Sequence, residues 1–170
     1  HYVDTVPSQV VGDLILDNIP HIDLSFVFFF GQYFLIGIVT FYPLLFRPEI
    51  APFVAKTFAA FVAVRSFFIV LTHLGAPQEF QNFWLQMDQQ GFIFKSFFLN
   101  DLFFSGHVGV PFLGALLFWE NKGMRYFMLA MSVVMGTTVL LMHVHYSIDV
   151  FAAYFITYSI YVVSDKIFNE

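Results

Sequence analysis

The sequence predicts an all-helical protein, a polytopic bundle of about five transmembrane helices in a single domain over residues 1–170. Hydrophobic residues make up 59% of the chain and charged residues only 11%, which is more apolar surface than a soluble domain of this size can bury. The mean hydropathy is +0.76, and the aromatic content of 21%, with 26 Phe, suits helices that face lipid. Several apolar stretches approach the ~20 residues that a helix needs to cross the hydrocarbon core.

Polar or helix-breaking residues separate the predicted spans. Residues 1–21 form a polar, acidic lead-in without the pattern of a signal peptide. Arg47 ends the first apolar run, and the second begins after Pro52. A long polar and aromatic stretch precedes the third span, a turn at residues 120–123 follows it, and a short link around residues 145–147 separates the last two. The predicted spans are residues 22–46, 53–74, 102–119, 126–143 and 148–163.

Charged residues between the spans set the predicted orientation. When the spans alternate in direction, one face holds the basic residues Arg47, Lys122, Arg125 and Lys166. The positive-inside tendency makes that face cytoplasmic. The opposite face has Lys95 as its base, and its acidic residues are Asp4, Asp13, Asp17, Asp23, Glu79, Asp88 and Asp101. Because the chain then starts outside, we expect a sixth span upstream and a cytoplasmic N-terminus in the full-length protein.

Two histidines and an aspartate fall at the same depth on the outer face. His107 lies near the start of the third span, and His145 and Asp149 lie where the fourth span meets the fifth. On a continuous helix the i, i+4 spacing of His145 and Asp149 lets the carboxylate accept the imidazole N–H, which makes a nucleophile or general base. Ser105 and Gly106 add a hydroxyl and a close backbone approach before His107, a combination suited to holding a phosphate and protonating a leaving oxygen.

Arg65 and His143 are the other ionisable residues near this predicted site. Arg65 lies past the middle of the second span toward its outer end, where an unpaired guanidinium costs ~2.5 to 3.5 kcal/mol on insertion scales. We therefore expect Arg65 to face the bundle interior and bind an anion, or else to pair with a buried carboxylate. His143 stands two residues before His145 and points to another helical face, so we expect it to be structural.

These residues stand in stretches that resemble the catalytic motifs of the sphingomyelin synthases. The stretches are Phe-Ser-Gly-His at residues 104–107 and His-Val-His-Tyr-Ser-Ile-Asp-Val at residues 143–150. Residues 64–77 are similar to the Arg-containing second-span motif of that family, which belongs to the wider superfamily of lipid phosphate phosphatases, the type 2 phosphatidic acid phosphatases. The hydrolytic branch of the superfamily carries a Ser-Arg pair where this chain has Thr138 and Val139. That difference favours the synthase branch.

The resemblance implies six spans, an active site on the non-cytoplasmic face and a catalytic triad of His107, His145 and Asp149. It further implies transfer of a phosphocholine or phosphoethanolamine headgroup from a glycerophospholipid to a ceramide-like lipid alcohol. His145 would attack the phosphorus or deprotonate the acceptor, and His107 would protonate the leaving oxygen. Arg65 and the backbone amides of residues 105–106 would hold the non-bridging oxygens. No metal or cofactor is required.

Two alternatives remain open from the sequence. A lipid phosphate phosphatase would use the same residues, with water in place of the acceptor alcohol. A non-enzymatic protein for lipid binding or transport would use its histidines to bind haem or a metal, since most of the six His lie near the outer face. The absence of Cys excludes thiolate metal sites and a thiol nucleophile. The expected partners are a phospholipid donor and a lipid alcohol acceptor in the membrane, and no nucleic acid.

Overall fold

The structure, a computed structural model, describes residues 10–72, 74–80 and 102–169. Within these ranges the fold is built from helices, which confirms the predicted all-α class. The helices are a 3-10 turn at Leu16–Asn18, a π-helical turn at Val27–Gly31 that continues into α2 (Gln32–Phe46), α3 (Ala51–Leu71), α5 (Gly106–Leu117), α6 (Lys122–Leu141) and α7 (Ser147–Phe168).

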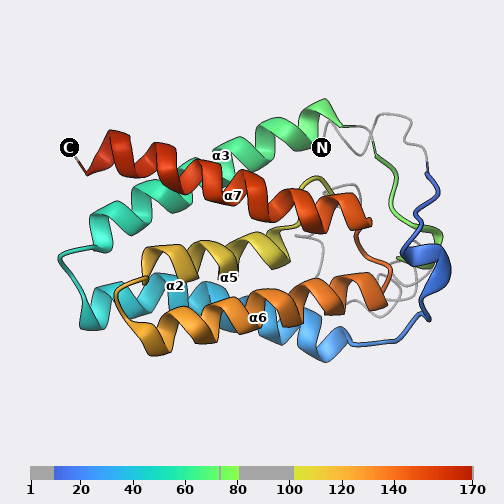
Figure 1. The fold of residues 1–170 in the computed structure, drawn as a ribbon, viewed down its shortest axis with the longest axis horizontal. Helices are drawn as coiled ribbons and strands as arrows, with labels where there is room; N and C mark the ends of the chain where they lie inside the picture. Colours follow the sequence, from blue (N-terminus) through green and yellow to red (C-terminus); the bar gives the residue numbers. More distant parts are fainter. Residues whose placement is uncertain (1–9, 73, 81–101, 170) are drawn as a thin grey trace, which may run out of the picture.

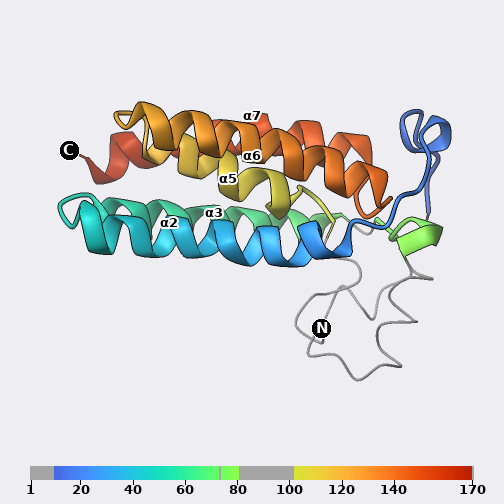
Figure 2. The same cartoon turned by 90° about the horizontal axis from the view of Figure 1, so that it is seen from below.

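The helices lie side by side along one axis (Figure 1). Helices α2 and α3 form one layer and α6 and α7 the other, and α5 lies between the layers (Figure 2). Helix α5 packs against α6, α7 and α2, while α3 packs against α7 and α2. Nine of the 12 residues of α5 are buried. The helix that begins with Gly106 and His107 is therefore the centre of the bundle.

Four helical segments are long and apolar enough to cross a membrane: Val27–Phe46, Ala51–Leu71, Lys122–Leu141 and Ser147–Phe168. They correspond to the first, second, fourth and fifth predicted spans. The third differs from the prediction, because α5 has only 12 residues and rises ~18 Å against a hydrocarbon core of ~30 Å. Its predicted first residues, 102–105, are not helical. Their backbone is bound instead to neighbouring elements, through the carbonyl of Phe104 and the N–H of Ser105.

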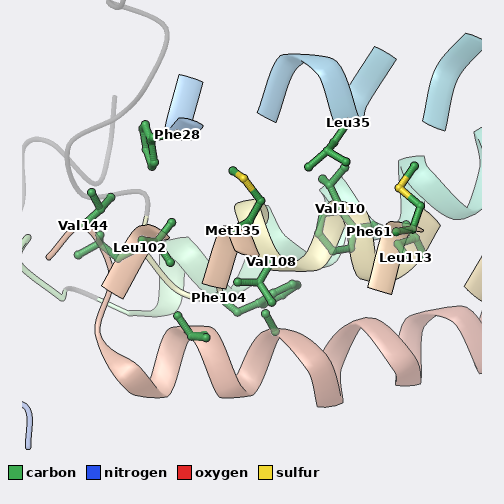
Figure 3. Close-up of a cluster of buried hydrophobic side chains, with 14 of the residues drawn as sticks. Phe28, Leu35, Phe61, Leu102, Phe104, Val108, Val110, Leu113, Met135 and Val144 are labelled. Atoms are coloured by element: carbon green, nitrogen blue, oxygen red, sulfur yellow. The ribbon is translucent and has the colours of Figure 1, made fainter. Parts of the chain in front are cut away.

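Glycines let α5 approach its neighbours closely. A Cβ on Gly109 would lie 2.7 Å from Cζ of Phe61 on α3, and one on Gly114 would lie 3.1 Å from Cγ2 of Val39 on α2. Real Cβ atoms do not approach as closely as the first of these distances. Figure 3 shows the apolar side chains that fill the space around α5, between α2 and α7. The centre of the bundle is thus closely packed, and its polar groups lie at one end.

The two ends of the bundle differ in charge. Every described Lys and Arg except Arg65 lies toward the end where α2 and α7 finish and α3 and α6 begin (Figure 1); these are Arg47, Lys56, Lys122, Arg125 and Lys166. The opposite end carries Asp13, Asp17, Asp23 and Glu79 without a described Lys or Arg other than Arg65, while Glu49, Glu120 and Asp165 lie among the basic residues. Lys95, Asp4, Asp88, Asp101 and residues 1–9 of the predicted lead-in lie outside the described residues.

Candidate active site

His107, His145 and Asp149 come together at the acidic end of the bundle. His107 is in the first turn of α5, His145 is in the turn between α6 and α7, and Asp149 is in the first turn of α7. The ring centroids of His107 and His145 are 6.2 Å apart, and Nδ1 of His145 lies 3.5 Å from Oδ2 of Asp149. The three residues are 7%, 3% and 0% exposed, respectively. Two buried imidazoles therefore lie close together, with a carboxylate beside Nδ1 of His145.

Asp149 is fixed by the backbone around it. Its Oδ2 accepts a hydrogen bond of 3.1 Å from the N–H of Tyr146, the residue that caps the start of α7. Its backbone carbonyl accepts from the N–H of Ser105 at 3.1 Å, which ties α7 to the segment before α5. The i, i+4 pair does not lie on a continuous helix, since α7 begins at Ser147, after His145. The turn, and not the helical repeat, brings His145 to the carboxylate.

Arg65 lies against the start of α5. Its Nε donates a hydrogen bond of 2.9 Å to the carbonyl of Phe104, and a Cβ on Gly106 would lie 3.3 Å from the same nitrogen. Only glycine leaves full room for the guanidinium at this position. Ser105 is fully buried, and its hydroxyl has no hydrogen-bond partner among the described residues. Arg65, Ser105 and Gly106 thus adjoin His107, as an anion-binding group must.

Two residues of the first span contact the site and were not predicted. The ring of Phe28 stacks on His107, with centroids 4.0 Å apart and planes 19° apart. The side-chain amide of Gln32 donates to the carbonyl of Gly106 at 3.5 Å. Gln32 is a polar residue in an apolar span, and that signal was available in the sequence. Phe28 lies in a run of phenylalanines, and nothing in the sequence distinguishes it from its neighbours.

The described part of the lead-in packs onto the same end of the bundle. Oδ2 of Asp13 accepts hydrogen bonds from the N–H and the hydroxyl of Ser147, at 2.7 and 2.8 Å. Burial acts to raise the pKa of Asp13, but the hydrogen bonds from Ser147, Leu16 and Ile15 outweigh it and hold this pKa below its usual value. The Tyr146 hydroxyl donates to the carbonyl of Gly75 at 2.8 Å. The lead-in therefore fixes the turn that carries His145.

His143 lies in the same turn but in a different environment. Its φ of 51° is left-handed. Its Nδ1 is 3.9 Å from Oε2 of Glu79, and its ring meets His21 edge to face, with centroids 5.6 Å apart. A cavity of about 410 Å³ lies here, between the lead-in, Glu79 and Tyr146. His143 thus contacts the lead-in side of the turn, which is not helical at this residue.

Comparison with known families adds one finding. Residues 100–166 match the family model of the PAP2 superfamily C-terminal region. The matched segment holds Ser105, His107, His145 and Asp149, and runs through α5, α6 and almost all of α7. No curated protein and no solved structure matches the chain. Within the described ranges, no cluster of three or more His, Asp or Glu side chains could hold a metal ion.

Proposed function

We propose that this chain, whose C-terminal part the family match assigns to the PAP2 superfamily of phosphatases and phosphotransferases, is a membrane lipid phosphotransferase. In this proposal it moves a phosphocholine or phosphoethanolamine headgroup from a glycerophospholipid to a ceramide-like lipid alcohol. The reacting groups are at the acidic, non-cytoplasmic end of the bundle. The proposal rests on the buried pair of imidazoles, 6.2 Å between centroids, with the described carboxylate of Asp149 beside Nδ1 of His145.

The carboxylate assigns different roles to the two histidines. Nδ1 is the nitrogen of His145 that lies beside Asp149, so Nε2 is the nitrogen left to act on a substrate. Asp149 stabilises the imidazolium that forms when His145 gains a proton or a bond to phosphorus. The ring of His107 stacks on Phe28. Because Asp149 stabilises the imidazolium of His145, His145 is the better nucleophile or base, and His107 is the better proton donor to a leaving oxygen.

The reaction balances in two steps. Nε2 of His145 attacks the phosphorus, the bond from phosphorus to the diacylglycerol oxygen breaks, and His107 protonates that oxygen. The primary hydroxyl of the acceptor then attacks the phosphohistidine, His107 takes its proton, and the bond from phosphorus to nitrogen breaks. In a direct transfer the same residues act in one step, with His145 deprotonating the acceptor hydroxyl.

The charge near the site favours a phosphodiester substrate. Among the described Lys and Arg residues, Arg65 alone lies beside the start of α5, and the others lie toward the opposite end. A phosphodiester carries one negative charge, whereas a phosphomonoester carries about −1.5 to −2 at pH 7. At the position of the hydrolytic branch's phosphate-binding pair, Thr138 bonds back to the carbonyl of Val134 and Val139 is buried. Among the described residues, the guanidinium of Arg65 is suited to the single charge of a diester headgroup.

One experiment separates the candidate functions. The purified protein is reconstituted in vesicles with phosphatidylcholine or phosphatidylethanolamine labelled in the headgroup, with and without ceramide, and the lipid products are identified. We expect a labelled sphingolipid and diacylglycerol only when ceramide is present. Release of phosphate or free headgroup without acceptor would instead show a lipid phosphatase. An inactive protein with stoichiometric metal or a haem absorption band would support the non-enzymatic alternative.

A further inference from the structure

An apolar groove runs between α3 and α7, away from the candidate site. Its α3 wall is Ala60, Val64 and Phe68, and its α7 wall includes Phe155, Ser159 and Val163; its volume is about 410 Å³. The hydroxyl of Ser159 donates to the carbonyl of Phe155, within its own helix. The Ser159 hydroxyl therefore needs no water molecule in the groove as a hydrogen-bond partner. We infer that this α3–α7 groove holds one acyl chain of the phospholipid donor, an inference that rests on the proposed lipid substrate.

The end of the groove that Phe68 lines adjoins Arg65, the proposed phosphate ligand. Val64 precedes Arg65 in the chain, and the ring of Phe68 contacts the rings of Phe103 and Phe104, with centroids 5.8 and 6.4 Å apart. The carbonyl of that same Phe104 accepts the hydrogen bond from Arg65. A phosphate held by Arg65 would therefore adjoin the end of the groove that Phe68 lines, and the rest of the groove extends toward the middle of the bundle. The cationic Arg65 and the adjoining apolar groove thus have the same order as the charged headgroup and the acyl chain of a phospholipid.

The direction and length of the groove also fit a chain. Helices α3 and α7 are antiparallel (Figure 1), and the α7 wall extends from Phe155 to Ser164. At 1.5 Å per residue this wall is ~13 Å long, close to the ~15 Å of one leaflet's share of the hydrocarbon core. Phe155 lies eight residues, or ~12 Å, along α7 from Ser147, so a long acyl chain that begins at the site would reach this wall and lie along the groove.

A second apolar groove provides a matched control. It lies between α2 and α6, is lined by residues including Phe34, Gly37, Phe41, Leu45 and Met124, and has a volume of about 360 Å³. It is as apolar as the first, but it extends toward the basic end of the bundle, away from Arg65 and the two histidines. Bulk lipid would fill both grooves equally. A donor chain anchored by its phosphate would occupy only the α3–α7 groove.

Groove-filling variants test the inference through chain-length selectivity. Ser159→Phe and Ala60→Phe add a ring to the α3–α7 groove, and Gly37→Phe adds one to the control groove, where a Cβ meets no atom within 4 Å. For a donor with long acyl chains we expect Ser159→Phe and Ala60→Phe to raise KM about tenfold or more. For a short-chain phosphatidylcholine their KM should stay near the wild-type value, and Gly37→Phe should change neither. Equal effects on long-chain and short-chain donors, or equal effects in both grooves, would overturn the inference.

A second measurement does not depend on turnover. A phosphatidylcholine with a photoreactive group in one acyl chain is added at trace level to vesicles that hold the protein, and the labelled peptides are identified. We expect label on α7 between Phe155 and Ser164 to exceed label on α2 severalfold, and to fall in Arg65→Gln. Equal labelling of both grooves would contradict the inference even in an active enzyme. Selective labelling in a protein without transferase activity would support the groove and contradict only the proposed reaction.

Discussion

His107 and His145 have different roles in the proposed mechanism, and an activated donor separates them. A donor whose leaving oxygen departs as a stable anion, such as a nitrophenyl ester of phosphocholine, needs no proton from the enzyme. On phosphatidylcholine the activity of His107→Ala should be lower than that of the wild type by a factor of ~10² to 10⁴, the usual contribution of a general acid. On the activated donor this variant should recover much of the lost activity. His145→Ala should show no recovery. Equal recovery in both variants, measured as initial rates, would remove the assignment of His107 as acid.

Asp149→Asn removes the charge of the carboxylate but keeps an oxygen that can accept a hydrogen bond. The amide oxygen can still accept from the N–H of Tyr146, as Oδ2 does at 3.1 Å, so the start of α7 should stay folded. Turnover should fall by ~10² to 10⁴, because a neutral amide neither stabilises the imidazolium nor enforces the useful tautomer. Asp165→Asn, on an exposed position of the same helix, is the matched control. Wild-type turnover in Asp149→Asn with an unchanged Tm would exclude Asp149 from the mechanism.

Some residues of the candidate site can be predicted from the sequence, whereas the contacts of others cannot. His107, His145, Asp149 and Arg65 are ionisable groups in or beside apolar spans, where such groups are costly, so they were predicted. Asp13 was predicted on the same side as His145, where the structure has it, but its bonds to Ser147 cross 134 residues of sequence. No local pattern encodes that pairing. It depends on the folded path of the lead-in.

Among the elements, the packing of the Phe61 ring of α3 against α5 depends on Gly109. Gly109→Ala would place a methyl group 2.7 Å from the ring of Phe61 and 3.1 Å from Oγ1 of Thr157, and overpacking of this kind costs ~1 to 3 kcal/mol. We expect a lower Tm and reduced turnover, because α5 carries His107. Gly37→Ala is the control, since its Cβ meets no atom within 4 Å. Thermal unfolding in detergent compares them, and an equal Tm for both would refute this account of the packing.

The contact between the lead-in and α7 should depend on pH. The folded pKa of Asp13 lies below the usual 3.8, so its stabilising contribution is complete above that value and is lost as pH falls through the folded pKa. Asp13→Asn should therefore lower Tm by a few degrees at pH 7, and the difference from wild type should shrink as pH falls below 3.8 and disappear below the folded pKa. Asp17→Asn, at an exposed position of the lead-in, is the control. A difference in Tm that grows on acidification would contradict the assigned direction.

The elements also show the limit of hydropathy as a guide. The four long helices were predicted within a few residues, because each is an apolar run between polar breaks. The third predicted span failed at its start, because Leu102, Phe103 and Phe104 are apolar but not helical. Their backbone groups bind Arg65 and Asp149 instead of the next helical turn. Composition alone does not distinguish an apolar helix from an apolar segment held by tertiary hydrogen bonds.

For the whole molecule, the two ends of the bundle have separate properties. The end with most of the described basic residues is the one that the positive-inside tendency retains in the cytoplasm. At the acidic end lie the lead-in, the starts of α5 and α7, and the neighbouring rings of His107 and His145. A short central helix with a charged site at its start, surrounded by long apolar helices, suits a substrate whose headgroup lies at the interface and whose chains lie in the bilayer.

The proposed mechanism requires that His145, and not merely a buried histidine in this turn, acts as nucleophile or base in headgroup transfer between lipids. The most direct test measures transfer of labelled headgroup from phosphatidylcholine or phosphatidylethanolamine to ceramide in vesicles that hold equal amounts of wild type, His145→Ala or His143→Asn. Asn tolerates the left-handed φ of 51° at residue 143. We expect transfer by the wild type, loss of transfer in His145→Ala and retention of most of it in His143→Asn. Undiminished transfer in His145→Ala would exclude His145 as nucleophile or base.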